Sequence, residues 1–368
     1  MKKWLVRIVV GLLLTIVVVL TIAFVMEKTD KAVIVNYISN ENLKTVKPDW
    51  RGVPVDEKGR FVNVEFAFLP KTLDLLRWQL SGNPQKEEKA NDTARLEIKD
   101  PTAFLSGEAD GILWLGHASF YIRVGGKTIL IDPVFGDPSF IKKFVVIPNP
   151  VEKIKTLDYV LLSHDHRDHC DEATIRQVAQ KFPNAKFLAG LRMDELLKDW
   201  LTPTNEIQTA GWFQQFNLPD ENAKITFLPV RHWCRRGLFD FNHKLWGGYV
   251  IEGGGKTVYF GGDSGFGSHY KETAEVFHEI DYFLIGIGAY SPRWFMEPNH
   301  NSPSDAAQAF IDSKAKILVP MHYGTFDLSD EPPSEPLKLL NNEARKRNFG
   351  DRVKPVAVNE SILFETAN

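Results

Sequence analysis

The run from Ser163 to His169 reads Ser-His-Asp-His-Arg-Asp-His and holds three histidines and two aspartates within six residues. The whole chain of 368 residues contains 10 histidines, so this concentration is not expected by chance. Imidazole and carboxylate groups are common protein ligands of zinc-like ions. The run directly follows the apolar stretch 159–162, which predicts a strand buried on both faces of a sheet. The chain is therefore interpreted as a metalloenzyme.

Length and charge narrow the class of protein. A chain of this length can bury a full-sized core, in one large domain or two. Its 44 basic and 47 acidic residues give a net charge of −3. Lys2, Lys3 and Arg7 precede the first acidic residue, so the remainder is more acidic still. Nucleic acid is not expected as a partner, because phosphate backbones attract basic surfaces. The oligomeric state is left open.

Residues 8–26 form an uncharged apolar segment. At about 1.5 Å per residue, a helix over this segment spans nearly the roughly 30 Å of a bilayer core. The basic residues before it favour a cytoplasmic N-terminus. We therefore expect a single-pass protein of the cell membrane, with residues 1–29 as cytoplasmic N-terminus and transmembrane helix and the catalytic domain on the extracytoplasmic (periplasmic or extracellular) side. A cleaved signal peptide and a buried core helix are the alternatives.

The remaining chain divides into a polar part and a part rich in strands. Residues 30–100 are interpreted as a linker and accessory helical segment, and 101–368 as the catalytic domain. An apolar stripe predicts a helix over 70–80, either packed on the main domain or facing a membrane or substrate. A further helix is expected over 172–180. Strands are expected at 111–116, 119–124, 127–131, 159–162, 186–188, 225–230, 248–251, 257–260, 282–287 and 316–320.

Residues suited to metal binding recur at the ends of these strands, where a rigid sheet can hold them on loops. Counting ligands predicts a two-metal site. The expected ligands are His164, His166 and His232 for one ion, Asp168, His169 and His322 for the other, and Asp263 as a bridge. Two divalent ions about 3.5–4 Å apart make a shared water nucleophilic, so hydrolysis of a phosphodiester or acyl bond is expected. Zinc suits this ligand set, and manganese or iron fit similar ligands.

The two cysteines, Cys170 and Cys234, each lie close to an expected ligand. Histidines and aspartates already fill the coordination positions. We therefore interpret both cysteines as small buried thiols, with a thiolate ligand or a disulfide as the alternative.

Further short motifs lie between about residues 60 and 330. They are Gly116-His117-Ala118-Ser119, Asp132-Pro133, His232–Arg236, Leu245-Trp246-Gly247, Gly262–Gly265, Tyr290–Met296 and His322–Thr325. Together with the histidine run, they resemble the metallo-β-lactamase superfamily, and within it the branch of N-acylphosphatidylethanolamine-hydrolysing phospholipases D. The resemblance implies an α/β fold, a four-layer αβ/βα sandwich, in which two zinc ions at the sheet edges are bound by the seven ligands above.

The resemblance also implies roles for other residues. His300 matches a histidine near the scissile phosphate, so we expect it to bind or protonate the phosphate or leaving group; a structural loop histidine is the alternative. Asp168 is expected to serve catalysis as well as metal binding. His117 and Asp132 are expected to orient ligands through hydrogen bonds. Substrate contacts are expected from Tyr290, Arg293 and Trp294.

The combined expectation is a membrane-anchored binuclear zinc hydrolase that cleaves phosphodiester bonds of phospholipids with a metal-bridging hydroxide. Its partners would be a phospholipid or other phosphodiester and, through the N-terminal anchor, the membrane. One alternative is an ester, lactone or β-lactam hydrolase, because a metal core specifies the nucleophile and not the electrophile. The other is a non-catalytic, metal-dependent lipid-binding protein.

Overall fold

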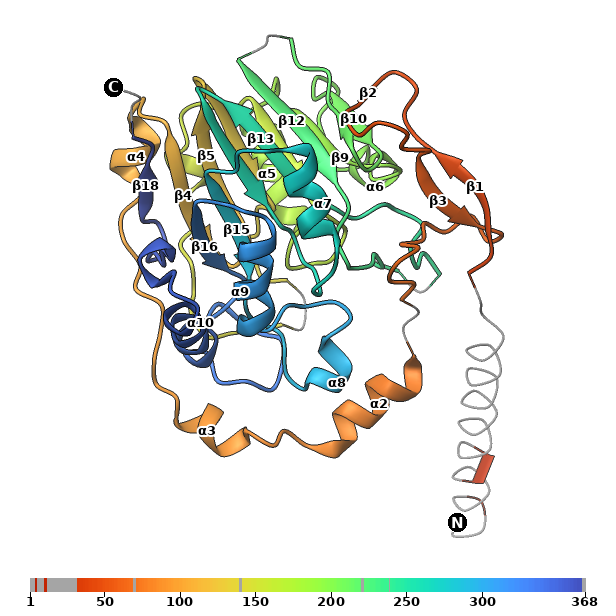
Figure 1. The fold of residues 1–368 in the computed structure, drawn as a ribbon, viewed down its shortest axis with the longest axis vertical. Coiled ribbons are helices and arrows are strands. Elements are labelled where there is room, and N and C mark those ends of the chain that lie inside the picture. Colours follow the sequence, from red (N-terminus) through yellow and green to blue (C-terminus); the bar gives the residue numbers. More distant parts are fainter. Residues whose placement is uncertain are drawn as a thin grey trace.

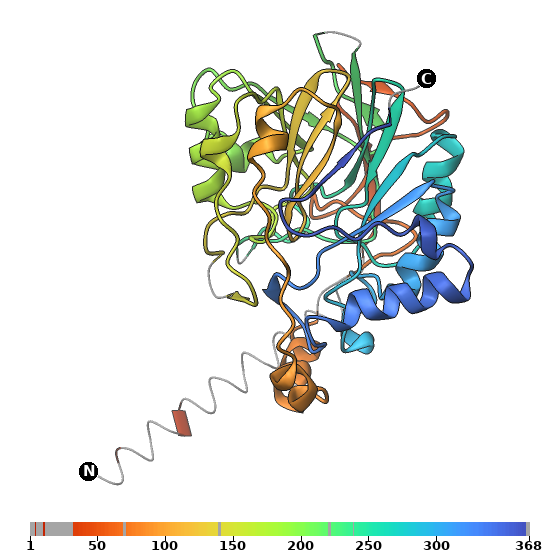
Figure 2. The same cartoon turned by 90° about the vertical axis from the view of Figure 1, so that its left-hand side faces the viewer.

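The computed structural model describes residues 32–68, 71–138, 141–219, 222–237 and 239–365, together with Trp4, Val10 and Gly11. Two seven-stranded sheets lie face to face at the centre of the molecule, and helices cover the outer face of each (Figures 1 and 2). The layers therefore follow the order helix, sheet, sheet, helix. This α/β arrangement is the αβ/βα sandwich expected from the sequence.

The first sheet has the strand order β10-β9-β8-β6-β5-β4-β18. Its strands are β4 (Gly111–Gly116), β5 (Ser119–Val124), β6 (Lys127–Ile131), β8 (Tyr159–Leu162), β9 (Lys186–Gly190), β10 (Ile207–Ala210) and β18 (Ser361–Leu363). Neighbours from β6 to β10 are parallel, and the other pairs are antiparallel. Every residue of β4, β5 and β8 is buried, which explains why β4 and β8 read as continuous apolar runs.

The second sheet has the strand order β16-β15-β14-β13-β12-β11-β2. Its strands are β2 (Lys44–Thr45), β11 (Gln214–Gln215), β12 (Ala223–Leu228), β13 (Gly248–Gly253), β14 (Lys256–Phe260), β15 (Tyr282–Gly286) and β16 (Ile317–Met321). β14, β15 and β16 are parallel, and the remaining pairs are antiparallel. Both sheets therefore combine a parallel half with an antiparallel half.

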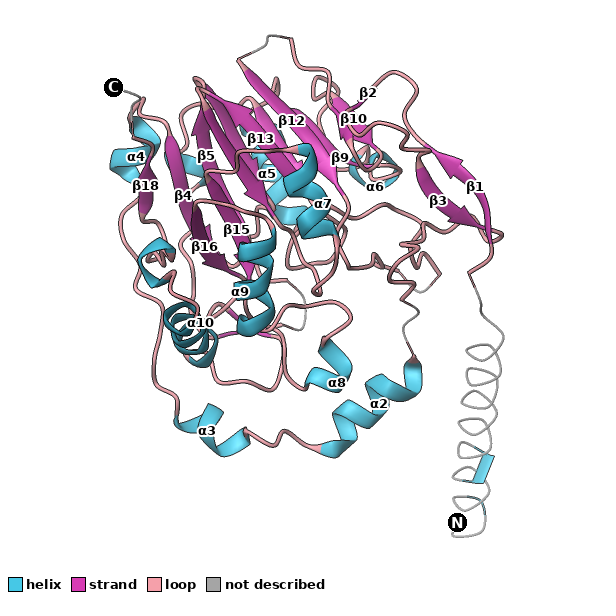
Figure 3. Cartoon of the chain, in the orientation of Figure 1, coloured by secondary structure: helices cyan, strands magenta, loops and turns pink. Residues whose placement is uncertain are grey.

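Helices α4 (Thr102–Ser106), α5 (Glu172–Lys181) and α6 (Asp194–Leu197) pack on the first sheet. Helices α7 (His269–Val276), α9 (Pro303–Asp312) and α10 (Glu335–Lys346) cover the second (Figure 3). Capping side chains fix where α5 and α9 start. Asp171 accepts a hydrogen bond from the backbone of Thr174 at α5, and Ser302 and Asp305 form a capping box at α9. A short α8 (Arg293–Met296) precedes α9.

The region before residue 101 contains strands where the sequence predicts a linker with short helical pieces. β1 (Ile34–Ile38) pairs with β3 (Val53–Asp56), and β2 closes one edge of the second sheet. Helix α2 (Thr72–Ser81) confirms the expected helix, and a second short helix, α3 (Lys86–Asn91), follows it. β7 (Lys142–Lys143) pairs with β17 (Phe326–Asp327) beside the main sheets. The domain boundary at residue 101 stays a prediction.

The expected transmembrane segment, residues 8–26, lies outside the described residues except for Val10 and Gly11. Across the part of the chain that the structure describes, no helix combines the length and apolar character needed to cross a membrane. The expectation of a single-pass membrane protein with an extracytoplasmic catalytic domain is corrected accordingly. Membrane anchoring forms no part of the function proposed below.

Tyr249 ties the two sheets together next to the histidine run. Its hydroxyl lies 2.6 Å from the carbonyl oxygen of Leu162 and 3.0 Å from that of Leu188, at or near the carboxyl ends of β8 and β9. The side chain is fully buried on β13 of the opposite sheet. This contact holds the end of β8, from which the histidine run starts, against the second sheet.

We expect Tyr249→Phe to lower the free energy of unfolding by about 1–3 kcal/mol, because buried carbonyl oxygens lose their donor. Urea denaturation of the metal-free protein measures this difference. Tyr37→Phe makes the same chemical change on the exposed face of β1 and should alter stability by less than about 0.5 kcal/mol. Equal stability of the two variants would show that the hydroxyl does not tie the sheets.

Candidate metal centre

The candidate ligands converge at one edge of the sandwich, where strands of both sheets end. Each follows the carboxyl end of its strand by a few residues, as expected for loops held by a sheet. They are His117 after β4, Asp132 after β6, His164, His166, Asp168 and His169 after β8, His232 after β12, Asp263 after β14 and His322 after β16. The seven residues predicted as ligands are therefore brought together, with His117 and Asp132 beside them.

Several residues at this edge have backbone conformations that residues other than glycine usually avoid. His117, Asp132 and His322 have φ values of 50°, 40° and 61°, in the left-handed region. Such residues cost on the order of 1–3 kcal/mol each and are found mainly at functional sites. Gly288 passes so close to His322 that a Cβ atom there would lie 2.2 Å from the His322 carbonyl oxygen. Glycine is therefore required at this position.

Three histidines form the first donor group. One nitrogen each of His164, His166 and His232 lies within 4.8 Å of the others. His166 Nδ1 and His232 Nε2 face each other at 3.2 Å. His232 Nδ1 lies 3.1 Å from the carbonyl oxygen of Asn299, which only accepts, so Nδ1 carries the proton and Nε2 keeps a lone pair. The group is arranged to donate nitrogen lone pairs to one centre.

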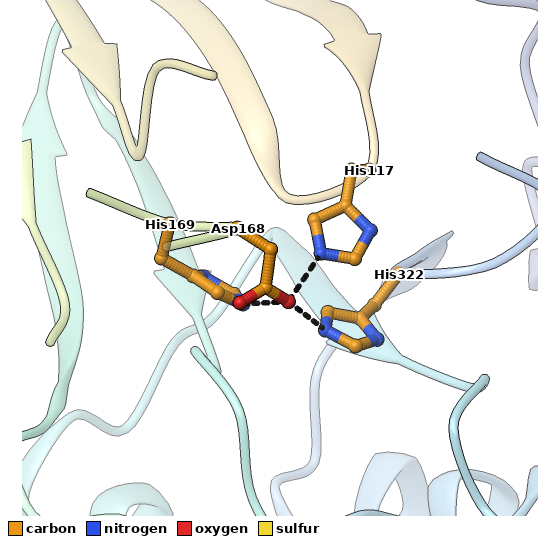
Figure 4. Close-up of side chains that lie close together, drawn as sticks. All are labelled: His117, Asp168, His169 and His322. Atoms are coloured by element: carbon orange, nitrogen blue, oxygen red, sulfur yellow. Dashed lines mark hydrogen bonds and ion pairs between the residues drawn. The ribbon is translucent and has the colours of Figure 1, made fainter. Parts of the chain in front are cut away.

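The second donor group surrounds the carboxylate of Asp168 (Figure 4). Its Oδ2 lies 3.1 Å from His117 Nε2 and 3.7 Å from both His169 Nε2 and His322 Nε2. His169 Nδ1 lies 2.8 Å from Oδ2 of Asp132 and donates to it, which leaves Nε2 turned toward the centre. His117 is thus within reach of the ligand that it was expected to orient.

Asp132 supports both the strand end and a ligand. Its carboxylate accepts hydrogen bonds from the backbone and hydroxyl of Ser163 at 2.7 and 2.5 Å, besides the bond from His169. The Ser163 hydroxyl lies 2.9 Å from His164 Nδ1. One buried carboxylate therefore helps orient histidines of both donor groups.

Asp263 lies between the two groups. Its oxygens are 3.2 Å from His169 Nε2 and 3.1 Å from His322 Nε2, and 3.9 Å from His232 Nε2. Gly262, with a φ of 55°, allows the chain to turn just before Asp263. A Cβ atom on Gly262 would lie 2.8 Å from the carbonyl oxygen of Gly247. The carboxylate is within reach of donors from both groups, as a bridging ligand requires.

Burial and mutual charges set the protonation of these groups. Burial raises the pKa of Asp168 and Asp263, but the neighbouring imidazoles outweigh it and hold both pKa values well below the usual range. Burial lowers the pKa of His322, whereas the carboxylates of Asp263 and Asp168 raise it, with a net result of about 9. In His232 burial prevails and the pKa falls well below its usual value.

Several buried nitrogens at the centre make no hydrogen bond within the described residues, among them Nε2 of His164 and His166. A buried polar atom without a partner is costly and calls for an explanation. Lone pairs and carboxylates that converge within 4.8 Å suit a cation, which would satisfy these atoms together. The donor set therefore fits metal ions.

His300 lies at the rim of the centre, with its side chain 18% exposed. Its Nδ1 is 3.8 Å from Asp263, and its ring centre is 5.3 Å from that of His232 and 5.5 Å from that of His322. Burial lowers its pKa to about 4 although Asp263 opposes the shift. The imidazole is therefore neutral at pH 7.

The three residues expected to contact substrate are engaged with protein groups. The Tyr290 hydroxyl bonds to Glu335, and Arg293 bonds to Asp305 at 2.7 Å and to the carbonyl oxygen of His300 at 3.2 Å. Trp294 is 42% exposed and lies under the guanidinium of Arg77, 4.4 Å from its ring centre. Their role as substrate contacts stays a prediction.

Two hollows beside the centre contain residues that sequence reasoning missed. One reaches His232 and is lined by aromatic side chains, including Phe66, Phe68 and Phe241. The other reaches His322 and includes Lys89 and Phe144. These residues belong to no motif, and an unusual density of phenylalanines near residues 61–68 was the one available signal. Cys170 and Cys234 are free and buried, as interpreted.

Comparison with known proteins agrees with this geometry. The family described as Beta-lactamase superfamily domain matches residues 127–323. N-acyl-phosphatidylethanolamine-hydrolyzing phospholipase D 1 of Caenorhabditis elegans is 31% identical over 227 residues, covering 58% of this chain and 64% of that protein. The match thus spans less than two thirds of the nematode protein. A UPF0173 metal-dependent hydrolase of Hyperthermus butylicus is 28% identical over 231 residues, covering 61% of this chain and 88% of that protein.

Among solved structures, Igni18, a metallo hydrolase from the archaeon Ignicoccus hospitalis, matches with a TM-score of 0.54 and 21% sequence identity, covering 70% of this chain and 99% of that chain. At this identity the likeness shows the fold alone. The family match spans more than half of the chain and includes the histidine run, His232, Asp263 and His322. The chain therefore belongs to the metallo-β-lactamase superfamily and has the fold of that superfamily.

Proposed function

We propose that this protein is a binuclear zinc hydrolase that cleaves phosphodiester bonds of phospholipids. The observation that carries the proposal is the position of Asp263, whose carboxylate lies between a three-histidine group and a group of one aspartate and two histidines. The choice of phospholipids is supported by the similarity to a relative named as a phospholipase D that hydrolyses N-acyl-phosphatidylethanolamine.

In this proposal His164, His166 and His232 would hold the first ion, and Asp168, His169 and His322 would hold the second. Asp263 would serve as a ligand of both. When bound, the two ions supply an activated water nucleophile and Lewis-acid stabilisation of the phosphate oxygens. Nitrogen and carboxylate donors suit zinc, and manganese or iron would be accepted by the same residues.

The chain's own residues set the ligand geometry and bind the substrate. Asp132 fixes the tautomer of His169, and His117 holds one oxygen of Asp168. Asp168 thereby contributes to catalysis as an oriented ligand. His300 faces the same space from the rim, and its neutral imidazole can donate an N–H to a phosphate oxygen or to the leaving group. Its low pKa favours this hydrogen bond over proton transfer from an imidazolium.

The proposal is tested by comparing substrates on protein of determined metal content. We expect hydrolysis of N-acylphosphatidylethanolamine, phosphatidylethanolamine or bis(p-nitrophenyl) phosphate, and loss of this activity in Asp263→Ala. Nitrocefin and a lactone, assayed in parallel, report on the other electrophiles that such a site can attack. Turnover of these two without any phosphodiester cleavage would replace the proposed substrate class.

His300→Ala should lower kcat for the cleaved phosphodiester by roughly 10²-fold or more, since a positioned hydrogen-bond donor is removed. Metal content should stay at the wild-type level, because His300 is not one of the proposed ligands. His300→Gln keeps an N–H donor on a side chain of similar length and should retain more activity than alanine. A kcat/KM equal to that of the wild type in His300→Ala would leave His300 as a structural loop histidine.

Zinc binding to the metal-free protein should release protons at pH 7. His322, with a pKa of about 9 against an ordinary 6.5, is protonated there and must lose its proton to bind. Affinity should therefore rise between pH 6.5 and 9, by about tenfold per pH unit for each proton released. The stability that this proton gives the metal-free protein is complete below pH 6.5 and is lost as the pH rises through about 9.

Calorimetric titration with zinc in two buffers of different ionisation enthalpy counts the released protons. Equal heats in the two buffers at pH 7 would mean that no proton leaves, and would contradict the charged state of His322.

A further inference from the structure

A buried lysine lies against the histidine run. Lys244 is 6% exposed, and its Nζ is 3.1 Å from Oδ2 of Asp165 and 2.9 Å from Oδ2 of Asp240. Asp165 is fully buried and stands in the sequence between His164 and His166. Burial lowers the pKa of Lys244, but the two carboxylates outweigh it and raise that pKa, so the ammonium stays charged. A charged pair is therefore buried directly beside two proposed ligands.

A second cation holds the same run through its backbone. Arg236 Nη1 donates to the carbonyl oxygens of Asp165 at 3.0 Å and Cys170 at 2.7 Å, near the start and just past the end of the run. Its guanidinium lies 4.8 Å from the ring centre of Trp200. Because the guanidinium is rigid and planar, it holds these two carbonyl groups at a set separation.

Both cations come from the loop between β12 and β13 that also carries His232. Asp240 links the two cations within this loop. Its carboxylate accepts hydrogen bonds from Lys244 Nζ at 2.9 Å, from the backbone N–H of Gly237 at 2.8 Å and from the backbone N–H of Arg236 at 3.3 Å. The loop is thus fastened to the run by the Lys244 ion pair and by the two Arg236 hydrogen bonds. His232 faces His164 and His166 across the same junction.

We propose that Arg236 and Lys244 are positioning residues that set the distance of His232 from His164 and His166, and thereby the metal affinity of the three-histidine group. This inference rests on the two-metal site proposed above. His166 Nδ1 and His232 Nε2 are 3.2 Å apart. If both nitrogens bind a metal ion, no hydrogen bond joins them. Their spacing then depends on the contacts that hold the two loops together. In the second group, by contrast, Asp132 contacts His169 directly and His117 contacts Asp168 directly.

A buried ion pair can also persist for a simpler reason, because either charge would be costly without the other. Replacing both charges separates these explanations. The double variant Asp165→Asn/Lys244→Met contains no unpaired buried charge at this junction but has lost the tie between the loops. If the pair only balances charge, this variant binds metal as the wild type does.

The test is zinc titration of the metal-free protein in competition with a chromophoric chelator, with bound metal counted per chain by mass spectrometry. In the double variant we expect one ion to bind with wild-type affinity and the other roughly 10–100-fold more weakly. Arg236→Gln should weaken the same ion, and it leaves no charge unpaired because the Arg236 side chain donates to neutral carbonyl oxygens. Lys47→Met, which removes an ion pair with Glu272 elsewhere in the molecule, is the matched control and should bind both ions normally.

Wild-type affinity for both ions in the double variant and in Arg236→Gln would overturn the inference, and so would an equal loss of both ions. Arg236→Gln decides alone if the double variant does not fold. A wild-type protein that binds fewer than two ions at saturation would instead contradict the two-metal site itself. Failure of the inference and failure of the proposed function are thereby distinguished.

Discussion

Two carboxylates, the buried Asp263 and the largely buried Asp168, lie among imidazoles, and some of the imidazole ring nitrogens lack hydrogen-bond partners within the described residues. A buried negative charge is tolerated only when it is compensated. In the metal-free protein the compensation comes from protons on His169 and His322, whose pKa values are raised by these same carboxylates. These protons supply part of the positive charge that two cations would bring. The strand ends, the left-handed residues and the close approach of Gly288 all serve to hold this arrangement.

Most strands of the two central sheets could be predicted because their information is local, whereas β2, β10, β11 and β18 were not expected. β4 and β8 are continuous apolar runs, and the Gly-Gly turn between β5 and β6 marks a hairpin. β2 could not be found in this way, because its two residues become a strand only by pairing with Gln214 and Gln215, far along the chain. Helix α9 carries a detectable signal, the capping box of Ser302 and Asp305, but no helix was expected there although His300 lies two residues before Ser302.

The candidate site shows the same division. The histidine run, His232, Asp263 and His322 could be chosen from residue type and from their place after strands, and the structure brings them together. The residues that hold them could not, since Lys244 and Arg236 act through contacts with a segment more than sixty residues away. The likeness of a short motif to a family does not by itself establish the role of each residue in it. Arg293, which was expected to contact the substrate, bonds to Asp305 and to the backbone of His300. The expected membrane localisation rested on the composition of residues 8–26 and on the basic residues Lys2, Lys3 and Arg7 before them.

The outer strands give the sandwich a further property. All seven proposed ligands lie within the superfamily match at residues 127–323, whereas β2, β4, β5 and β18 lie outside it. A fragment of residues 127–323 would keep every proposed ligand but lose His117. It would also expose the backbone edges of β6 and β11, which lose their neighbours β5 and β2. Exposed strand edges can pair with other copies of the chain and so promote aggregation. The segment that defines the family in sequence is therefore smaller than the segment that must fold. Deletion from either terminus would remove support for metal binding before it removed a ligand.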